Sequence, residues 1–413
     1  MKIEPYGLDP VPVEERKGTW YQLFFIWAGV SFCLPSFIIG ALLVPAFSWY
    51  QAVNINFVGN LAVGVLIVVG GYFGTRTGLP AAVFGRRVFG DRFGHWLPTL
   101  ILLFTMFGWF AVMIGMTGEI ISMMIEQATG YSMFVAVIVV VGLLNALTAV
   151  FGYHNIQLLS RVSVPLLGIF CLILVIKIYS LGQVSEAIRY TPVRTMTFGE
   201  GIDLVIGGYI SAALAASDFS RYARSNRHNW LGTLPGTFIV SFLLGLLGMI
   251  SVAVTGNWNP LLVVQSLGLG IPVLLFVLLA NWTTNDNMLY TAGFALTNIL
   301  PRLTRWQNTL LCGVAGTLVA VMGLVNFMEQ WLILLSSLYS PLIGVMLVDF
   351  FVIKRWSKGV SINIEALAAV GAGVIFAHIA PARYIISVVG LIAGSTAYIT
   401  LVIITQFVQR KRK

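Results

Sequence analysis

The sequence predicts an all-α integral membrane protein with about twelve transmembrane helices. The 413-residue chain is 58% hydrophobic and only 9% charged, whereas soluble domains carry about a quarter charged residues. The apolar residues are spread over the whole length, which excludes a soluble domain with a single anchor. They also recur in stretches of about 20 residues, the length that a helix needs to cross a bilayer.

Each apolar stretch is expected to form one membrane-spanning helix. The third stretch is longer than the bilayer requires and is therefore expected to be tilted. The polar segments between the stretches are too short for a separate soluble domain. The expected spans are 20–46, 53–74, 97–126, 132–151, 155–180, 198–222, 230–255, 271–299, 307–326, 329–352, 361–380 and 384–408.

Both ends of the chain are expected on the cytoplasmic side. Residues 1–19 are polar and lack the basic start and cleavage site of a signal peptide, so the first span is expected to remain as a helix. Cytoplasmic loops collect Lys and Arg, and one side of the predicted topology, which includes the basic tail 409–413, holds nearly all of them. The net charge of +9 therefore reflects topology rather than a nucleic-acid partner. The basic residues expected on the outer side are Lys177, Arg189, Arg194 and Arg383.

Several classes of chemistry find no support in the sequence. Cys33, Cys171 and Cys312 lie in apolar segments, without metal-ligand spacing and without a disulfide framework. The sequence contains no Walker A loop, paired-cysteine zinc pattern or helical His-Glu-x-x-His. It also lacks the clustered acids, bases or metal ligands that an enzyme would need. Transport driven by an ATPase domain of this chain is thereby excluded, and coupling to an ion gradient is left.

Two spans carry signals for an interrupted helix. In the first, Pro35 cannot donate a hydrogen bond to the Ser31 carbonyl, and Gly29 lowers the cost of unwinding. In the sixth, the run 207–212 (Gly-Gly-Tyr-Ile-Ser-Ala) lies near the middle. Because these spans are five apart, matching interruptions predict an inverted-repeat transporter with its site at the membrane midplane. The alternative is an ordinary proline kink, with small residues that serve helix packing.

A polar cassette, residues 281–287 (Asn-Trp-Thr-Thr-Asn-Asp-Asn), interrupts the apolar stretch 271–300. Hydrocarbon offers no hydrogen-bond partners, so these side chains are expected to bind cargo or an ion, or to line a wet cavity. Thr283 and Thr284 lie one turn after Ala280. Together with carbonyls freed by a broken helix, the two hydroxyls can coordinate a desolvated sodium ion. The alternative is that each hydroxyl bonds back to its own helix.

A flat ligand is predicted from two aromatic side chains, Trp109 in the third span and Tyr209 in the sixth, which are suited to stacking on its faces. Met106 lies on the Trp109 face by helical spacing, and Ser211 adds a hydroxyl. Asn285 offers two donors and an acceptor for a heterocyclic amide edge. The alternatives are plain packing for the aromatic residues, which make up 13% of the chain, and a helix–helix hydrogen bond for Asn285.

The remaining intramembrane charges are interpreted more simply. Glu119 is a lone acid in the outer half of the third span; such an acid indicates function by default, and a hydrogen-bonded structural role fits it equally well. Asp218 and Arg221, near the inner end of the sixth span, are interpreted as interfacial and as a local pair.

Five motifs carry a resemblance to a known family. They are Pro10-Val11-Pro12 with Arg16-Lys17-Gly18, Gly71-Tyr72-Phe73-Gly74 with Thr77-Gly78-Leu79, Gly108-Trp109-Phe110, Ile210-Ser211-Ala212 with Asp218-Phe219, and Trp282-Thr283-Thr284-Asn285-Asp286-Asn287 with Leu289-Tyr290. With these motifs the chain resembles the nucleobase–cation symporters, and most closely the bacterial cytosine permeases. The last motif is the most specific of the five.

The resemblance implies a leucine-transporter-like fold in the bacterial inner membrane. Residues 20–180 would form the first five-helix inverted repeat and residues 198–352 the second, while 361–408 would add two helices. The resemblance also implies a sodium site. Its ligands would be the carbonyls of Gly29, Phe32 and Ala280 and the hydroxyls of Thr283 and Thr284.

The resemblance further implies a flat heterocycle stacked between Trp109 and Tyr209, with polar contacts from the Gly208 backbone, Ser211 and Asn285. The chain departs from the cytosine permeases at two of these positions. Tyr209 stands where they usually carry Phe, and Met106 stands where they carry Gln one turn before the tryptophan. A thioether lacks the donor and acceptor of an amide, so the ligand is expected to differ from cytosine or to be held differently.

The function predicted from these observations is sodium-coupled import of a cytosine-like nucleobase, or a related planar heterocycle, by alternating access, with no other cofactor. The alternatives are another cargo (hydroxymethylpyrimidine, a purine, hydantoin or allantoin) and proton coupling through Glu119 or Asp286. A membrane receptor that binds without transport is a further alternative from a different class.

Overall fold

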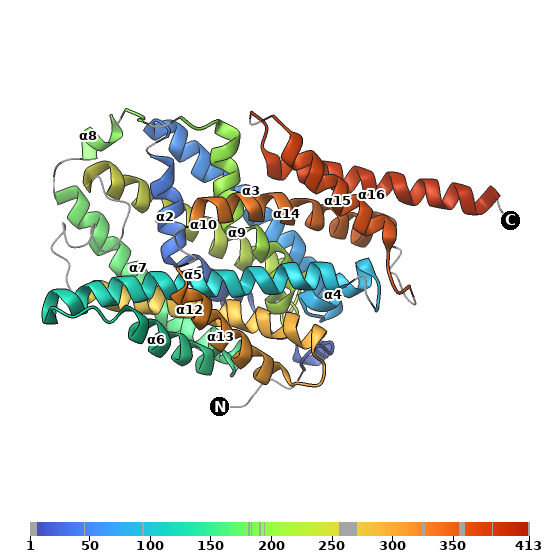
Figure 1. Cartoon of the computed structure of the whole chain (residues 1–413), viewed down its shortest axis with the longest axis horizontal. Helices are drawn as coiled ribbons and strands as arrows, with labels where there is room; N and C mark the ends of the chain where they lie inside the picture. The colour runs from blue at the N-terminus through green and yellow to red at the C-terminus, as the bar shows by residue number, and fades with distance from the viewer. Residues whose placement is uncertain are drawn as a thin grey trace.

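The computed structural model is a bundle of helices, most of which run side by side across the molecule (Figure 1). It describes residues 6–411 except 45, 93–94, 181, 183, 190, 194, 256–270, 324–326, 355–359 and 382, and for 186–187 and 271–277 it describes the backbone alone. Arg194, the end of the predicted span 307–326 and part of the predicted tail 409–413 lie outside the described residues.

Every expected span coincides with a helix or, for the first, with a pair of helices. The helices of the twelve spans are α1 (Trp20–Ser31) with α2 (Leu34–Leu43), α3 (Trp49–Thr77), α5 (Trp96–Thr129), α6 (Phe134–Ala149), α7 (Tyr153–Ser180), α9 (Phe198–Ser220), α10 (Asn226–Thr255), α12 (Ile271–Ile299), α13 (Arg305–Val321), α14 (Met328–Val348) with the π-helix η3 (Asp349–Ile353), α15 (Ile364–Ile379) and α16 (Ile386–Lys411). Three short elements had no counterpart in the prediction, namely η1 (Val13–Glu15), α4 (Ala81–Phe89) and α8 (Val184–Ile188).

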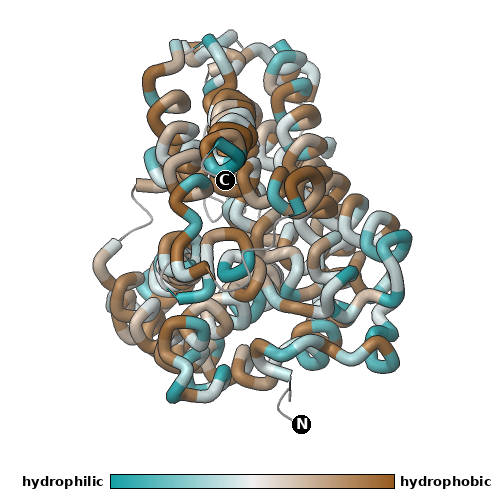
Figure 2. Tube along the Cα trace, turned by 90° about the vertical axis from the view of Figure 1, so that its right-hand side faces the viewer, coloured by the Kyte–Doolittle hydropathy of each residue, from teal (hydrophilic) through white to brown (hydrophobic). Residues whose placement is uncertain are grey.

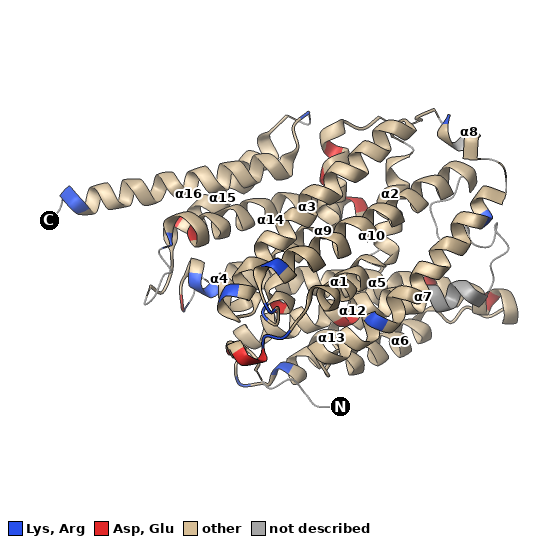
Figure 3. Cartoon of the chain, turned by 180° about the vertical axis from the view of Figure 1, so that it is seen from behind, with Lys and Arg blue, Asp and Glu red and all other residues tan. Residues whose placement is uncertain are grey.

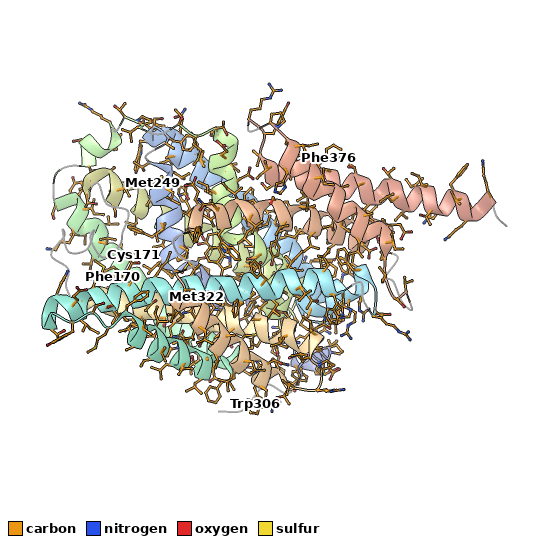
Figure 4. The ribbon with its side chains drawn as sticks, in the orientation of Figure 1. Phe170, Cys171, Met249, Trp306, Met322 and Phe376 are labelled. Carbon is orange, nitrogen blue, oxygen red and sulfur yellow. The ribbon has the colours of Figure 1, made fainter. Side chains whose placement is uncertain are left out.

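The length and composition of these helices suit a bilayer. Within the described residues, seven helices are long and apolar enough to cross a membrane, and the bent pair α1–α2 adds an eighth. Hydrophobic residues are found throughout the bundle (Figure 2), and side chains such as Trp306 on α13 and Phe376 on α15 lie at the outside of the bundle (Figure 4). The chain is a multi-pass membrane protein.

The first span is broken as predicted. Helices α1 and α2 meet at an angle of 60°. Pro35 is the second residue of α2 and has no amide hydrogen. The Ser31 carbonyl instead accepts hydrogen bonds from the Cys33 amide at 2.9 Å and from Ser36 Oγ at 2.6 Å. The proline therefore ends one helix and begins the next.

The predicted interruption of the sixth span is wrong. Helix α9 is continuous through Gly207 and Gly208. Both glycines serve close packing rather than unwinding: an added Cβ on Gly207 would lie 2.1 Å from the Leu332 carbonyl of α14, and one on Gly208 would lie 2.3 Å from Ile39 Cδ1 of α2. Small residues in a membrane helix allow this approach of neighbouring backbones.

Helix α9 forms the centre of the bundle. It packs chiefly against α3 and α14, while α5, the long helix across the front of Figure 1, packs against α12, and α1 packs against α10. Nearly all of α9 is buried. The elements that the sequence singled out, the α1–α2 break, α5, α9 and α12, therefore face one another in the interior.

The interfacial position of the two charges at the end of α9 stays a prediction, but neither side chain is exposed to solvent. Asp218 and Arg221 are both fully buried. The Asp218 carboxylate accepts a hydrogen bond from the Ala81 amide at 2.8 Å, at the start of α4, and Arg221 donates to the Gly7 carbonyl at 3.0 Å. Most other Lys and Arg residues lie near helix ends and in loops (Figure 3). These buried groups fasten α4 and the N-terminal segment to the bundle.

Candidate functional site

The break between α1 and α2 releases two backbone carbonyls. In an unbroken helix the amides of Cys33 and Leu34 would bind the carbonyls of Gly29 and Val30. The Cys33 amide donates instead to the Ser31 carbonyl, and the Leu34 amide donates to a side chain of α12 at 3.3 Å. The Gly29 and Val30 carbonyls are therefore available to groups from other helices.

Two threonine hydroxyls of α12 meet these carbonyls. Thr283 Oγ1 lies 2.9 Å from the Gly29 carbonyl oxygen and 3.0 Å from that of Ala280. Thr284 Oγ1 lies 3.2 Å from the carbonyl oxygens of Gly29, Val30 and Ala280. Both hydroxyls are buried. Uncharged carbonyl and hydroxyl oxygens gathered at an unwound helix suit a desolvated hard cation such as sodium.

Four of the five predicted ion ligands are thereby brought together, namely Gly29, Ala280, Thr283 and Thr284. The fifth, Phe32, caps the end of α1, and its amide binds the Ala28 carbonyl at 2.8 Å. The second α1 carbonyl that the threonine hydroxyls contact is that of Val30, where that of Phe32 was expected.

Another residue beside this cluster gave no signal in the sequence. Ser160 on α7 is fully buried, and its Oγ has no hydrogen-bond partner among the described residues. A Cβ added to Gly29 would lie 2.7 Å from that Oγ, so the hydroxyl sits against the broken turn. A single serine in an apolar helix ordinarily indicates packing, and only the fold brings it to this place.

The break is held in position by Asn281. Its Oδ1 accepts the Leu34 amide at 3.3 Å, which replaces a lost helical bond. Its Nδ2 donates to Thr117 Oγ1 at 2.7 Å and to the Met113 carbonyl at 3.3 Å, both on α5. The sequence placed Asn281 in the polar cassette without a role; the structure makes it the link between the break and α5.

A cavity of about 20 Å³ lies beside the break, between α5, α9 and α12. That volume holds about one water molecule, so these helices must separate before a heterocyclic ring can enter. The predicted substrate residues Trp109, Gly208, Tyr209 and Ser211 line it, together with Val30, Cys33, Pro35, Ile39, Met113, Ala212, Thr284 and Met288.

The hydroxyl of Tyr209 is tied to the break. It forms a hydrogen bond with Ser36 Oγ in the first turn of α2. Ser36 Oγ in turn donates to the Ser31 carbonyl and lies 2.9 Å from Cys33 Sγ. The residue predicted to stack on cargo is thus bonded to the segment that presents the carbonyls predicted to bind an ion. Ser36 was missed in the sequence because its partner is 173 residues away.

Asn285 does not line the cavity in this conformation, but it lies close by on α12. It is four residues after Asn281, which faces α5, and three before Met288, which lines the cavity, so the three share a helix face. It is 1% exposed, and among the described residues neither its Nδ2 nor its Oδ1 has a partner. A buried polar group left unpaired costs about 1–3 kcal/mol, and the amide edge of a ligand would remove that cost.

Met106 is likewise buried outside the cavity wall, one turn before Trp109. Met113, one turn beyond Trp109 on the same face, lines the cavity instead. The helical spacing on which the prediction relied does not tell which of these two methionines lies at the ligand.

The other polar residues of the cassette do not line the cavity. Asp286 accepts a hydrogen bond from Thr148 Oγ1 on α6 at 2.7 Å, and that hydroxyl also accepts one from Trp282 Nε1 at 2.9 Å. Asn287 donates to the carbonyl of Thr283 in its own helix at 2.6 Å. Glu119 is half-buried and does not line the cavity.

Comparison with known proteins places this geometry in a family. The family model described as "Permease for cytosine/purines, uracil, thiamine, allantoin" matches residues 10–411. The cytosine permease of Escherichia coli (strain K12) is 30% identical over 405 residues, which cover 96% of this chain and 94% of the relative. The hydantoin permease of Microbacterium maritypicum is 25% identical over 379 residues, covering 84% and 75%.

Solved structures agree on the fold. The chain matches Mhp1, a nucleobase-cation-symport-1 family transporter, in a closed conformation with bromovinylhydantoin bound; the TM-score is 0.82 at 21% identity, covering 96% of this chain and 94% of Mhp1. It matches a Na⁺-coupled sialic acid symporter with a TM-score of 0.67 at 13% identity, covering 95% and 90%. The predicted leucine-transporter-like inverted-repeat fold is confirmed, although the exact repeat boundaries at 20–180 and 198–352 stay a prediction. The chain belongs to the family of permeases for cytosine, purines, uracil, thiamine and allantoin, the nucleobase–cation symporters.

Proposed function

We propose that this permease imports a planar heterocycle of the nucleobase class, cytosine-like or related, together with sodium. The sodium ion would lie between the broken turn of α1 and the two threonines of α12. The heterocycle would lie between Trp109 and Tyr209, with its polar edge toward Asn285 and Ser211.

The observation that carries the proposal is that the two sites share residues. Thr284 lines the cavity, and its hydroxyl also contacts the Gly29 and Val30 carbonyls. Val30 contributes to both places as well. Cargo that touches these residues changes the positions of the oxygens around the ion. By linkage, each ligand then strengthens the binding of the other by the same factor.

This arrangement suggests a sequence of events. Sodium bridges α1 and α12 and fixes the break in one geometry, with the cavity still open on one side. Stacking of the cargo on Trp109 and Tyr209 then favours closure, because Tyr209 is bonded to α2 through Ser36. Alternating access follows as the broken helix and its neighbours rock against α5 and α12.

Uptake by the purified protein in proteoliposomes tests the ion site. An inward sodium gradient should stimulate uptake of labelled substrate relative to choline, and Thr283→Ala combined with Thr284→Ala should abolish that stimulation. Thr396→Ala is the matched control, because its exposed hydroxyl bonds only within α16. Full sodium-stimulated uptake by the double variant would overturn the proposed ion site.

The identity of the cargo is addressed by a panel of labelled cytosine, uracil, hypoxanthine, hydroxymethylpyrimidine, hydantoin and allantoin. We expect a compound with neighbouring donor and acceptor atoms on its ring to be preferred, because Asn285 offers both kinds of atom. Binding without flux into sealed vesicles would indicate a receptor instead.

Proton coupling is the second candidate for the energy source, and Asp286 is the residue that favours it. Its carboxylate is 3% exposed and accepts the Thr148 hydroxyl. A buried intramembrane acid is a reasonable proton carrier. Uptake driven by an inward pH gradient in choline, and lost in Asp286→Asn, would replace sodium by protons in the proposal.

A further inference from the structure

Helix α7 lies beside both elements of the proposed ion site. It packs against α1, which carries the broken turn, and against α12, which carries the two threonines. The oxygens assigned to the ion so far come from α1 and α12 alone. A side-chain oxygen of α7 that reaches the broken turn would therefore add a third helix to the site.

Ser160 reaches the broken turn from α7. The position that a Cβ of Gly29 would take lies 2.7 Å from Ser160 Oγ and 3.6 Å from Thr283 Cβ. Because Gly29 has no side chain, the serine hydroxyl occupies the space that one would fill. Ser160 and Thr283 thus lie against the same residue of the turn, and the carbonyl oxygen of that residue is 2.9 Å from Thr283 Oγ1.

The hydroxyl of Ser160 is not used by its own helix. A serine inside a helix commonly donates to the carbonyl four residues earlier, as Ser340 of α14 does to the Ser336 carbonyl at 2.6 Å. Ser160 is fully buried, and its Oγ has no hydrogen-bond partner among the described residues. A buried hydroxyl without a partner is unfavourable, and a cation at the neighbouring carbonyls would supply one.

We infer that Ser160 Oγ is a further oxygen ligand of the coupling ion, supplied by α7. This role rests on the proposed function, because it adds a ligand to the sodium site. A hydroxyl is an uncharged oxygen donor of the same kind as the threonine hydroxyls already assigned to the ion, and such donors suit hard cations. The number of ligands also contributes to selectivity between cations of different size. A smaller ion such as lithium is satisfied by fewer oxygens, so Ser160 is expected to favour sodium over lithium.

Thermal unfolding of the purified full chain measures cation binding without transport. The protein is titrated with sodium chloride or lithium chloride, and choline chloride keeps the ionic strength constant. Binding raises the melting temperature by mass action, so each titration gives an apparent Kd. Ser160→Ala should weaken sodium binding about tenfold and lithium binding by less than about threefold. In choline alone the variant should melt no lower than the wild type, because the lost hydroxyl has no described partner.

A matched control and a second variant support this comparison. Ser251→Ala on α10 also removes a fully buried hydroxyl without a described partner, but α10 supplies none of the oxygens assigned to the ion. It should bind both cations as the wild type does. Ser160→Cys keeps the shape of the side chain and exchanges a hard oxygen for a soft sulfur, so it should lose sodium affinity as Ser160→Ala does, and it serves if Ser160→Ala does not fold.

The contradicting results differ for Ser160 and for the ion site as a whole. Wild-type sodium affinity in Ser160→Ala, with the sodium response lost in Thr283→Ala combined with Thr284→Ala, would overturn the α7 ligand and leave the proposed ion site in place. Equal losses for sodium and lithium, together with a lower melting temperature in choline, would assign Ser160 to packing and overturn its role as a ligand. A wild-type protein that melts at the same temperature in sodium and in choline would overturn both the ligand and the ion site.

Discussion

The first span and α9 carry similar small residues, yet the first span is broken at its centre and α9 is not. The first span has a proline after its glycine, and the proline removes one helical hydrogen bond outright. In α9 the glycines lie against the backbone of α14 and a side chain of α2. This close packing stabilises the helical conformation in spite of the flexibility of glycine. Glycine permits a break, but the proline decides whether one forms.

The comparison also separates two uses of a buried polar group. At the break, the carbonyls of Gly29 and Val30 lack their helical donors and are met by threonine hydroxyls. In α9 the backbone bonds stay intact, and the polar contribution comes from a side chain, Tyr209. An ion site is therefore expected at the first span, and a cargo contact at α9.

The largest effect is expected from a side chain added to α9. In Gly207→Leu the new Cβ meets the Leu332 carbonyl, which is backbone and cannot turn aside, so α9 and α14 must separate at a cost of about 3 kcal/mol or more. The fraction of monodisperse protein after heating, measured by size-exclusion chromatography, should fall sharply. Gly168→Leu on α7, where an added Cβ has no neighbour within 4 Å, is the control. Equal stability of the two variants would contradict the packing role of α9.

The next largest effect is expected from two asparagines on one face of α12, whose substitutions should act on different quantities. Asn285→Leu removes an amide without a described partner, so the ligand-free protein should be at least as stable as the wild type, while substrate affinity falls by about 10-fold to 100-fold. Asn281→Leu removes bonds to Leu34, Thr117 and Met113 and should lower the melting temperature. Melting curves with and without substrate measure both quantities. Destabilisation by Asn285→Leu alone would mean that its amide has a structural role.

A smaller effect is expected where the two regions meet. Tyr209→Phe keeps the stacking ring but removes its bond to Ser36, and Ser36→Ala removes the same bond from the other side. Each variant should bind substrate, but the gain in affinity on adding sodium should shrink by about threefold to tenfold. The loss in the double variant should be smaller than the sum of the two single losses, because both variants remove the shared bond between Tyr209 and Ser36. Additive losses would place the coupling elsewhere, without affecting the proposed ion site.

The smallest effect concerns the two methionines of α5. Met113→Gln places an amide at the cavity wall and should change the order of preference among the labelled heterocycles. Met106→Gln, one turn before Trp109, should change each affinity by less than about threefold. Competition assays against one labelled substrate measure both. If Met106→Gln changed the order of preference and Met113→Gln did not, Met106 would be the methionine that contacts the ligand, as the sequence analysis expected.

Much of the fold could be predicted because a bilayer constrains helices through length and polarity alone. Every expected span has a helix, and the proline break was placed correctly. The short helix α4 was missed because nine residues carry too little periodic signal. Threonines 283 and 284 were found because polar residues in an apolar stretch stand out. Ser36 and Ser160 were not, because a lone serine is common in membrane helices and their surroundings come from distant segments.

By itself, the sequence determined the membrane class, the helices, the break at Pro35 and the residues rich in oxygen on α12, because each depends on the chemistry of neighbours within a few turns. Only the tertiary structure decided that α9 runs unbroken, that Thr284 contacts both the released carbonyls and the cavity, and that Asn285 lies buried without a described partner. These outcomes depend on which backbone or side chain approaches from another helix. Hydrogen bonding and close packing act over a few ångströms in space, and distance along the chain does not reveal them.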